Sequence, residues 1–189
     1  MIATDMLTQI DAAADALRTG GVVAYPTEAV YGLGCDPFAR DAFDAVFALK
    51  QRPPTQGVLL IASDFEQVAA FIAGNVAPDA IARASATWPG PATWVCPRSD
   101  EVPVWVTGAH AGIALRVTAH PIASELCRRF GGAIVSTSAN RHGQPPAKTS
   151  ADVRAAFGVQ LAYILDGAVG GLGKPTPIRD AISGDFIRT

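Results

Sequence analysis

The regular alternation of helix-spaced and strand-like segments constrains the fold of this chain more than any other feature. Apolar residues recur at helical spacing between Ile10 and Leu17, and two glycines follow at the point where a helix would stop. A short apolar run then ends at Pro26, as is typical of a buried strand. Segments of both kinds continue to alternate along the chain. The pattern therefore predicts an α/β protein with helices packed on a sheet.

The expected elements are short and follow one another without a linker long enough to separate two domains. We expect helices over residues 8–17 (with Thr8 as N-cap), 41–50, 65–72, 78–86, 122–130 and 151–157. We expect strands over residues 22–25, 58–62, 93–96, 113–118, 133–136, 161–165, 178–182 and 185–188. The glycine-punctuated stretch after Pro26 and residues 167–177 are expected to be loops. Ser183-Gly184 predicts a tight hairpin turn, which requires antiparallel pairing as well. The prediction is a single domain over residues 1–189 with a twisted, mixed parallel and antiparallel sheet and flanking helices.

The overall composition agrees with one globular domain and excludes several function classes. The chain has 189 residues, of which 49% are hydrophobic and 17% charged. It has no run of about 18 to 20 apolar residues and no secretory signal pattern, so a cytoplasmic, membrane-free protein is expected. The spacing of its three cysteines and three histidines predicts free thiols and no zinc site built from protein ligands. A net charge of −2 argues against a protein whose main task is to grip nucleic acid.

Lys50 and Arg52 are the first candidates for binding an anion. No GxxxxGK[ST] or GxGxxG motif follows a predicted strand, so side chains and irregular loops would have to hold any phosphate. Lys50 and Arg52 stand where a predicted helix ends before Pro53, which would direct both side chains to a common side. The compact ammonium charge of a lysine beside the planar, bidentate guanidinium of an arginine suits the binding of a triphosphate. The alternative is a basic helix end that complements the helix dipole.

A polar segment, Ser-Thr-Ser-Ala-Asn at residues 136–140, directly follows a predicted strand. In open α/β sheets, ligands bind at the carboxyl ends of strands. The hydroxyl and amide groups of Ser138 and Asn140 can contact phosphate or ribose oxygens without burying a charge. An ordinary polar turn is the alternative.

Arg116 lies in the middle of a predicted strand, on the face opposite Ile113, Leu115 and Val117. An arginine at such a position requires an anionic partner. That partner is either the carboxylate of a ligand or a neighbouring Asp or Glu in a structural ion pair. The chain shows no Ser-His-Asp or Cys-His arrangement, so positioning and charge stabilisation are expected rather than covalent catalysis.

Five segments, in this order along nearly the whole chain, resemble the TsaC/YrdC family of threonylcarbamoyl-AMP synthases. They are residues 24–36, 49–53, 88–93, 115–118 and 135–140. The resemblance implies a twisted α/β fold with a concave, positively charged cavity, and the length is similar to the short bacterial form. It also implies an activity: a nucleotidyltransferase that forms threonylcarbamoyl-AMP and pyrophosphate from L-threonine, bicarbonate and ATP. The product would serve the threonylcarbamoyladenosine modification of tRNA.

The resemblance further implies which residues form the site. Lys50, Arg52, Ser138 and Asn140 match the KxR and SxN signature that holds ATP, with Lys50 and Arg52 as catalytic residues and Arg188 near the phosphates. The implied neighbours of L-threonine are Thr27, Thr93, Arg116, Ser136 and Thr176. Mg²⁺ would be held mainly through ATP. The implied downstream partner is a tRNA threonylcarbamoyl transferase complex, and weak RNA binding in the cavity is a further hypothesis. Relatives often carry Ser at the position of Thr176, which keeps the hydroxyl.

Two other functions remain as alternatives. One is a non-catalytic RNA-binding or ribosome-maturation factor, which the net charge of −2 disfavours. The other is a carbamoyl-adenylate enzyme similar to the related domain of hydrogenase-maturation carbamoyltransferases. Those domains are part of much longer chains, and no acylphosphatase-like or zinc-finger segment accompanies this one.

Overall fold

The computed structural model of the chain describes residues 2–52 and 57–189. Its helices are α1 (Thr4–Arg18), α2 (Arg40–Lys50), α3 (Phe65–Ala69), α4 (Pro78–Ser85), α5 (Val104–Thr107), α6 (Pro121–Phe130), α7 (Ser150–Phe157) and the 3₁₀ helix η1 (Gly158–Gln160). Its strands are β1 (Val23–Pro26), β2 (Tyr31–Gly34), β3 (Leu59–Ala62), β4 (Thr93–Pro97), β5 (Gly112–Val117), β6 (Ile134–Ser138), β7 (Tyr163–Ile164), β8 (Ile178–Asp180) and β9 (Phe186–Arg188). Among the described residues the strands form one sheet in the order β7-β1-β2-β6-β3-β5-β4-β8-β9. The predicted mixed sheet with flanking helices is confirmed.

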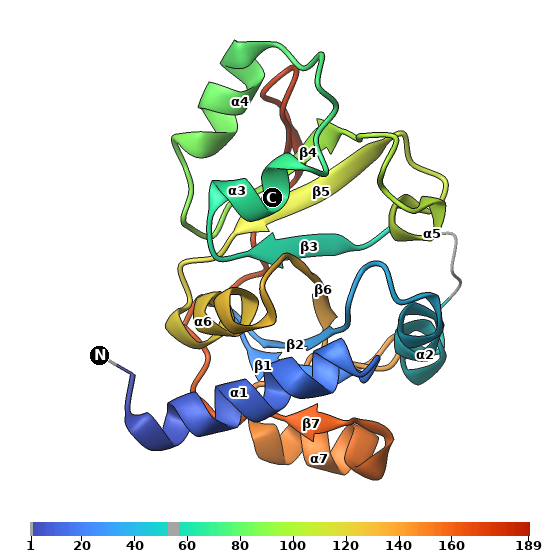
Figure 1. Ribbon diagram of the computed structural model, residues 1–189, viewed down its shortest axis with the longest axis vertical. Helices are drawn as coiled ribbons and strands as arrows, with labels where there is room; N and C mark the ends of the chain where they lie inside the picture. The colour runs from blue at the N-terminus through green and yellow to red at the C-terminus, as the bar shows by residue number, and fades with distance from the viewer. Residues whose placement is uncertain (1, 53–56) are drawn as a thin grey trace.

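Strand β6 joins the two halves of the sheet (Figure 1). Its first residues pair antiparallel with β3, where Val135 faces Leu60. Its last residues pair antiparallel with β2, where Thr137 faces Leu33. Parallel pairs connect β1 with β7, β3 with β5 and β4 with β8. The sheet is therefore continuous because one strand changes partner along its length.

The loop expected after Pro26 is wrong in part, because it contains strand β2. A Cβ atom at Gly34 would lie 2.5 Å from the carbonyl oxygen of Val135 and 2.8 Å from the ring of Tyr25. Glycine is thus required here by the close approach of neighbouring strands and does not mark a turn.

The two faces of the sheet have different coverings. Helices α1 and α6 lie side by side on one face, and their apolar cluster includes Tyr25, Ile61 and Ile134 (Figure 1). The opposite face carries the larger core, which takes up Leu60 and Leu115. The expected alternation in β5 is confirmed, because its residues in phase with Leu115 are buried in the larger core and those out of phase are free to face a cavity.

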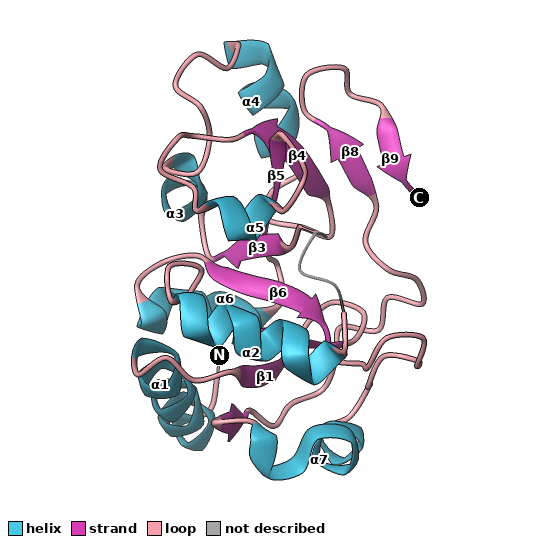
Figure 2. Ribbon diagram, turned by 90° about the vertical axis from the view of Figure 1, so that its right-hand side faces the viewer, coloured by secondary structure: helices cyan, strands magenta, loops and turns pink. Residues whose placement is uncertain are grey.

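Some element boundaries differ from the prediction for identifiable reasons. Helix α1 begins at Thr4, and Thr8 is an ordinary helical residue whose hydroxyl donates to the Thr4 carbonyl. Helix α3 ends at Ala69, and Ile72 beyond it forms a β-bridge with Arg98. The hairpin of β8 and β9, at one edge of the sheet in Figure 2, is closed by residues 181–185 rather than by a two-residue turn. Within the described residues, no helix combines the length and the apolar character that a membrane crossing requires.

Candidate active site

A cavity of about 500 Å³ opens on the face of the sheet formed by β3, β5 and β6. A smaller pocket of about 120 Å³ adjoins it, and Arg52 and Ser138 line both hollows. All the site residues predicted from the sequence line one hollow or the other: Thr27, Lys50, Arg52, Thr93, Arg116, Ser136, Ser138, Asn140, Thr176 and Arg188. Residues scattered over most of the chain thus meet in one place, and they form two chemically different ends.

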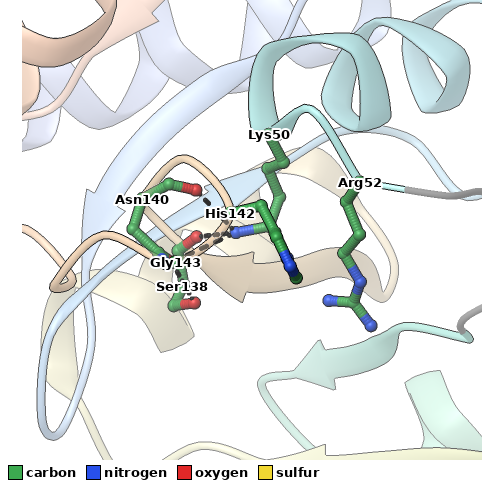
Figure 3. Close-up of a pocket in the computed structure, with 6 residues that line it drawn as sticks. All are labelled: Lys50, Arg52, Ser138, Asn140, His142 and Gly143. Atoms are coloured by element: carbon green, nitrogen blue, oxygen red, sulfur yellow. Dashed lines mark hydrogen bonds between the residues drawn. The ribbon is translucent and has the colours of Figure 1, made fainter.

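The first end is built around Lys50, the last residue of α2. Gln51 adopts the left-handed conformation, with φ of 52°, and this ends the helix and turns the chain. The Lys50 side chain is buried, and its ammonium donates to the carbonyl oxygens of Ser138 and Asn140 and to Asn140 Oδ1 (Figure 3). These acceptors lie after or at the end of β6, not on α2. Lys50 does stand in the last turn of α2, as the alternative of a basic helix end requires, but its hydrogen bonds go to another segment.

Three acceptors occupy the three hydrogens that an ammonium can donate. The same loop is closed from within, because Ser138 Oγ donates to Asn140 Oδ1 at 2.6 Å. Lys50 therefore ties the end of α2 to the end of β6 and brings a positive charge to the pocket. Burial and the nearby charge of Arg52 lower the pKa of Lys50 to about 8.

Arg52 is the more available cation at this end. Its only hydrogen bond among the described residues is a long one of 3.4 Å from Nη2 to the Gly57 carbonyl, and its buried Nε has no partner there. Its guanidinium also lies 5.8 Å from the ring centre of Phe47. Neither Lys50 nor Arg52 forms an ion pair within residues 2–52 and 57–189. This end of the cavity therefore carries uncompensated positive charge. Pro53 was expected to direct the Arg52 side chain. Residues 53–56 lie outside the part of the chain that the structure describes.

His142 is a member of this pocket that the sequence reasoning missed. Its backbone N–H donates to the carbonyl of Lys50 at 2.8 Å, and its ring points into the pocket between Lys50 and Arg52 (Figure 3). The ring makes no hydrogen bond to the part of the chain that the structure describes. The available signal was its place two residues after Asn140, but a single histidine without a paired ligand forms no metal-binding pattern.

The second end is built around Arg116 on β5, which is buried and pairs with the buried carboxylate of Glu28 at 3.2 Å. Arg116 Nη1 also donates to Thr176 Oγ1 at 2.8 Å, and that hydroxyl lies 3.5 Å from Thr93 Oγ1. The structural ion pair, one of the two partners considered for Arg116, is thus present. Arg116 still lines the cavity, so the ion pair does not remove it from the site.

The remaining predicted residues surround these two ends. Ser136 and Ser138 both lie within β6, so the predicted strand end at residue 136 is two residues too early, and of the predicted site residues in this segment only Asn140 follows the strand. The strand continues beyond its predicted end because its last residues pair with β2, a strand that was not predicted from the sequence. Thr27 donates to the Val30 carbonyl at 2.7 Å, and Arg188 donates to the Thr176 carbonyl at 3.1 Å. Arg188 therefore sits beside Thr176, and its expected role near phosphates stays a prediction.

Comparison with known proteins places this geometry in a family. The family model Sua5_yciO_yrdC, described as "Telomere recombination", matches residues 15–189. The chain belongs to the Sua5/YciO/YrdC family. It is 50% identical to the threonylcarbamoyl-AMP synthase of Coxiella burnetii over 97% of this chain and 98% of the relative. It is also 50% identical to the threonylcarbamoyl-AMP synthase of Stenotrophomonas maltophilia over 95% of this chain and 97% of that protein.

Solved structures of this family have the same fold. The P. abyssi Sua5 complexed with L-threonine superposes with a TM-score of 0.86 and 33% identity over 92% of this chain. The chain spans about half of that protein, 51% of its length. The E. coli YciO structure superposes with a TM-score of 0.81 at 24% identity, which bears on the fold alone.

The arrangement allows this Sua5/YciO/YrdC domain to bind an elongated ligand or two ligands end to end. The Lys50 end presents surplus positive charge and amide and hydroxyl groups, which suit phosphates. The Arg116 end presents a guanidinium held against a carboxylate and a group of hydroxyls, which suit a small polar molecule with both charges. Neither hollow is lined by Asp or Glu among the described residues, and the three cysteines are buried. The site is therefore suited to positioning and charge stabilisation.

Proposed function

We propose that this chain is a threonylcarbamoyl-AMP synthase, which joins L-threonine, bicarbonate and ATP into threonylcarbamoyl-AMP and pyrophosphate. The observation that carries the proposal is the pairing of two unlike ends in one cavity. One end has unpaired cations at Lys50 and Arg52, and the other has the balanced pair of Arg116 and Glu28. Relatives that share half of its residues over almost the full length bear this name, which supports the same activity.

At the Lys50 end we assign the triphosphate of ATP. Arg52 and His142 would donate to phosphate oxygens, because neither has its donors fully used within the described residues. Lys50 would act through its charge and by holding Ser138 and Asn140 in place, since its hydrogens are already engaged. Mg²⁺ would enter with ATP, bound through phosphate oxygens and water, and would withdraw charge from the phosphates.

At the Arg116 end we assign L-threonine. Arg116 would orient the carboxylate, and the hydroxyls of Thr93, Ser136 and Thr176 would contact its remaining polar groups. The threonine amine would form a bond to the carbon of bicarbonate with loss of water, which gives N-carboxythreonine. A carbamate oxygen would then bond to the α-phosphorus of ATP while the bond to pyrophosphate breaks. The protein would hold both reactants in line and offset the charge that develops on the phosphates.

The product is an activated acyl adenylate, so a second protein must accept it. We assign that role to a tRNA threonylcarbamoyl transferase complex, which would place the group on adenosine in tRNA. Weak contact between tRNA and the rim of the cavity would fit a direct transfer, although Lys plus Arg total only 15 against 17 Asp plus Glu.

The test is an incubation of the purified protein with labelled bicarbonate, L-threonine and ATP. The expected result is threonine-dependent pyrophosphate and a labelled adenylate. No adenylate from well-folded protein would contradict the proposal. Carbamoyl phosphate in place of threonine and bicarbonate tests the carbamoyl-adenylate alternative, and salt-dependent RNA binding without ATP turnover would favour the RNA-binding alternative.

A further inference from the structure

Glu28 is a buried carboxylate that stands directly behind Arg116. It belongs to the loop between β1 and β2, is 6% exposed and lines neither hollow. Its Oε2 lies 3.2 Å from Arg116 Nη2. Its Oε1 accepts hydrogen bonds from Thr118 Oγ1 at 2.6 Å and from the Ala119 N–H at 3.2 Å. The carboxylate is therefore held from two sides while it faces the guanidinium.

This ion pair is poorly explained as a stabilising device. Burying two charges costs several kcal/mol of desolvation per ion, and well-packed apolar replacements of such pairs are often as stable. The geometry is also imperfect, since Glu28 Oε2 and Arg116 Nε make no hydrogen bond within the described residues. What the pair does achieve is an orientation, because Arg116 turns Nη2 to Glu28 and Nη1 to Thr176. The guanidinium is thereby fixed at the cavity wall.

The backbone of Glu28 also anchors the loop that carries Thr176. The Glu28 carbonyl accepts from the Leu172 N–H at 3.0 Å, and the Thr27 carbonyl accepts from the Gly170 N–H at 2.9 Å. A Cβ atom at Gly170 would lie 3.0 Å from the Glu28 backbone, so the two segments are in close contact. One residue thus holds Arg116 by its side chain and the Thr176 loop by its main chain.

The charge balance has a consequence for what this end can bind. An unpaired arginine in a cavity attracts any anion, including phosphates that belong at the Lys50 end. Arg116 with Glu28 has no net charge, so a carboxylate can still take hydrogen bonds from the guanidinium while a polyanion gains little. A zwitterionic amino acid, which is itself neutral overall, matches such a pair.

We propose that Glu28 is a positioning residue for the amino-acid subsite: it orients Arg116 and balances its charge, so that this guanidinium accepts the carboxylate of a zwitterionic amino acid and does not itself attract phosphates. The inference rests on the proposed function, because it takes L-threonine as the ligand of the Arg116 end. The side chain of Glu28 acts through Arg116 and lines neither hollow.

A double-mutant cycle tests this by calorimetric binding of L-threonine to the full chain. Glu28→Gln is expected to weaken binding about tenfold or more. The new amide would either place an N–H group against the Arg116 guanidinium or offer it one acceptor oxygen fewer than the carboxylate. Glu28→Gln added to Arg116→Gln is expected to weaken binding no further than Arg116→Gln alone. Inorganic pyrophosphate is expected to compete with L-threonine in Glu28→Gln and not in the wild type. A merely structural role for Glu28 would leave the pyrophosphate competition unchanged.

Two further variants keep the test decisive. Glu125→Gln is the matched control, because Glu125 also pairs with arginines, Arg128 and Arg129, but on helix α6 and not in either hollow. It should bind L-threonine as the wild type does. Thr118→Val removes the 2.6 Å hydrogen bond to Glu28 and keeps both charges, so it should weaken binding about two- to fivefold even if Glu28→Gln does not fold.

The outcomes separate this inference from the proposed function. If the wild type binds L-threonine and both Glu28→Gln and Thr118→Val bind it equally well, the positioning role is wrong and the proposed function stands. Additive losses in the double variant would also overturn the positioning role. If the wild type does not bind L-threonine at all, the proposed function fails and this inference fails with it.

Discussion

The two ends of the cavity treat positive charge in opposite ways. At the Lys50 end, the charges of Lys50 and Arg52 meet no carboxylate among the described residues, and the pocket they line includes the exposed residues His142 and Gly143. At the Arg116 end, the buried Arg116 pairs with Glu28, and Arg188 lies beside Thr176 at the cavity wall. The difference teaches that the two ends are distinguished by whether a carboxylate balances the cation, more than by the number of cations. Surplus charge suits a polyphosphate, and a balanced pair suits a zwitterion.

The largest effect is expected from Arg52→Ala, which removes the cation with most donors left for a ligand. We expect kcat/KM for ATP to fall about 30- to 1000-fold, which corresponds to about 2 to 4 kcal/mol of transition-state stabilisation. Steady-state kinetics with L-threonine saturating would measure it. The affinity for L-threonine and the melting temperature should stay close to the wild-type values. An equal loss of threonine binding would show that the two ends are not separate, and Arg40→Ala, at an exposed ion pair, is the control.

The next effect is expected at the opposite end, from Arg116→Lys. The variant keeps the positive charge but loses the fork that contacts Glu28 and Thr176 together. We expect KM for L-threonine to rise about tenfold, or about 1.4 kcal/mol, with KM for ATP unchanged. Initial rates with each substrate varied in turn separate the two constants. A rise in KM for ATP by the same factor would contradict the assignment of the ends.

A dependence on pH should appear at the Lys50 end. Burial and the neighbouring Arg52 lower the pKa of Lys50 to about 8, so Lys50 is charged below pH 8 and loses its proton above it. Phosphates favour the charged form, so ATP binding above pH 8 requires uptake of a proton. We therefore expect ATP affinity to weaken as pH rises through about 8, by up to about tenfold per pH unit. Binding measured from pH 7 to 9.5 tests this, and Lys50→Arg should flatten the curve; an equally steep curve in Lys50→Arg would assign the effect to another group.

The smallest effect is expected from His142→Ala, which removes one imidazole donor from the pocket. Loss of a single hydrogen bond of about 0.5 to 1.5 kcal/mol should raise KM for ATP about two- to tenfold. His142→Gln keeps a donor and should recover most of the affinity. L-Threonine binding should not change in either variant, and no change in KM for ATP would remove His142 from the phosphate site.

Most helices and strands were predictable because their periodicity is local. The spacing of apolar residues placed α1, α2 and α6 within a few residues, and the alternation in β5 correctly assigned its two faces. Strand β2 was missed because glycines stand where its packing leaves no room for side chains, and that shortage of space is visible only in the folded protein. The end of β6 was misplaced for the same reason, since its partner is β2.

The candidate site was predictable as a set of residues but not as a set of contacts. Motifs in family order identified Lys50, Arg52, Ser138 and Asn140, and all of them line one pocket. The spacing of the motifs did not predict that the Lys50 ammonium donates hydrogen bonds to Ser138 and Asn140. His142 was missed because a single histidine in a polar loop carries no pattern.

The sequence by itself determined the α/β class, the order of most elements and the residue types that can hold phosphates and a carboxylate, because these depend on local periodicity and on side-chain chemistry. Only the tertiary structure decided where charge is balanced. Arg116 had two possible partners until the β1–β2 loop brought Glu28 behind it, with Thr118 and Ala119 holding the carboxylate. Ion pairing depends on which distant segments become neighbours, and burial then sets how strongly those charges act on each other.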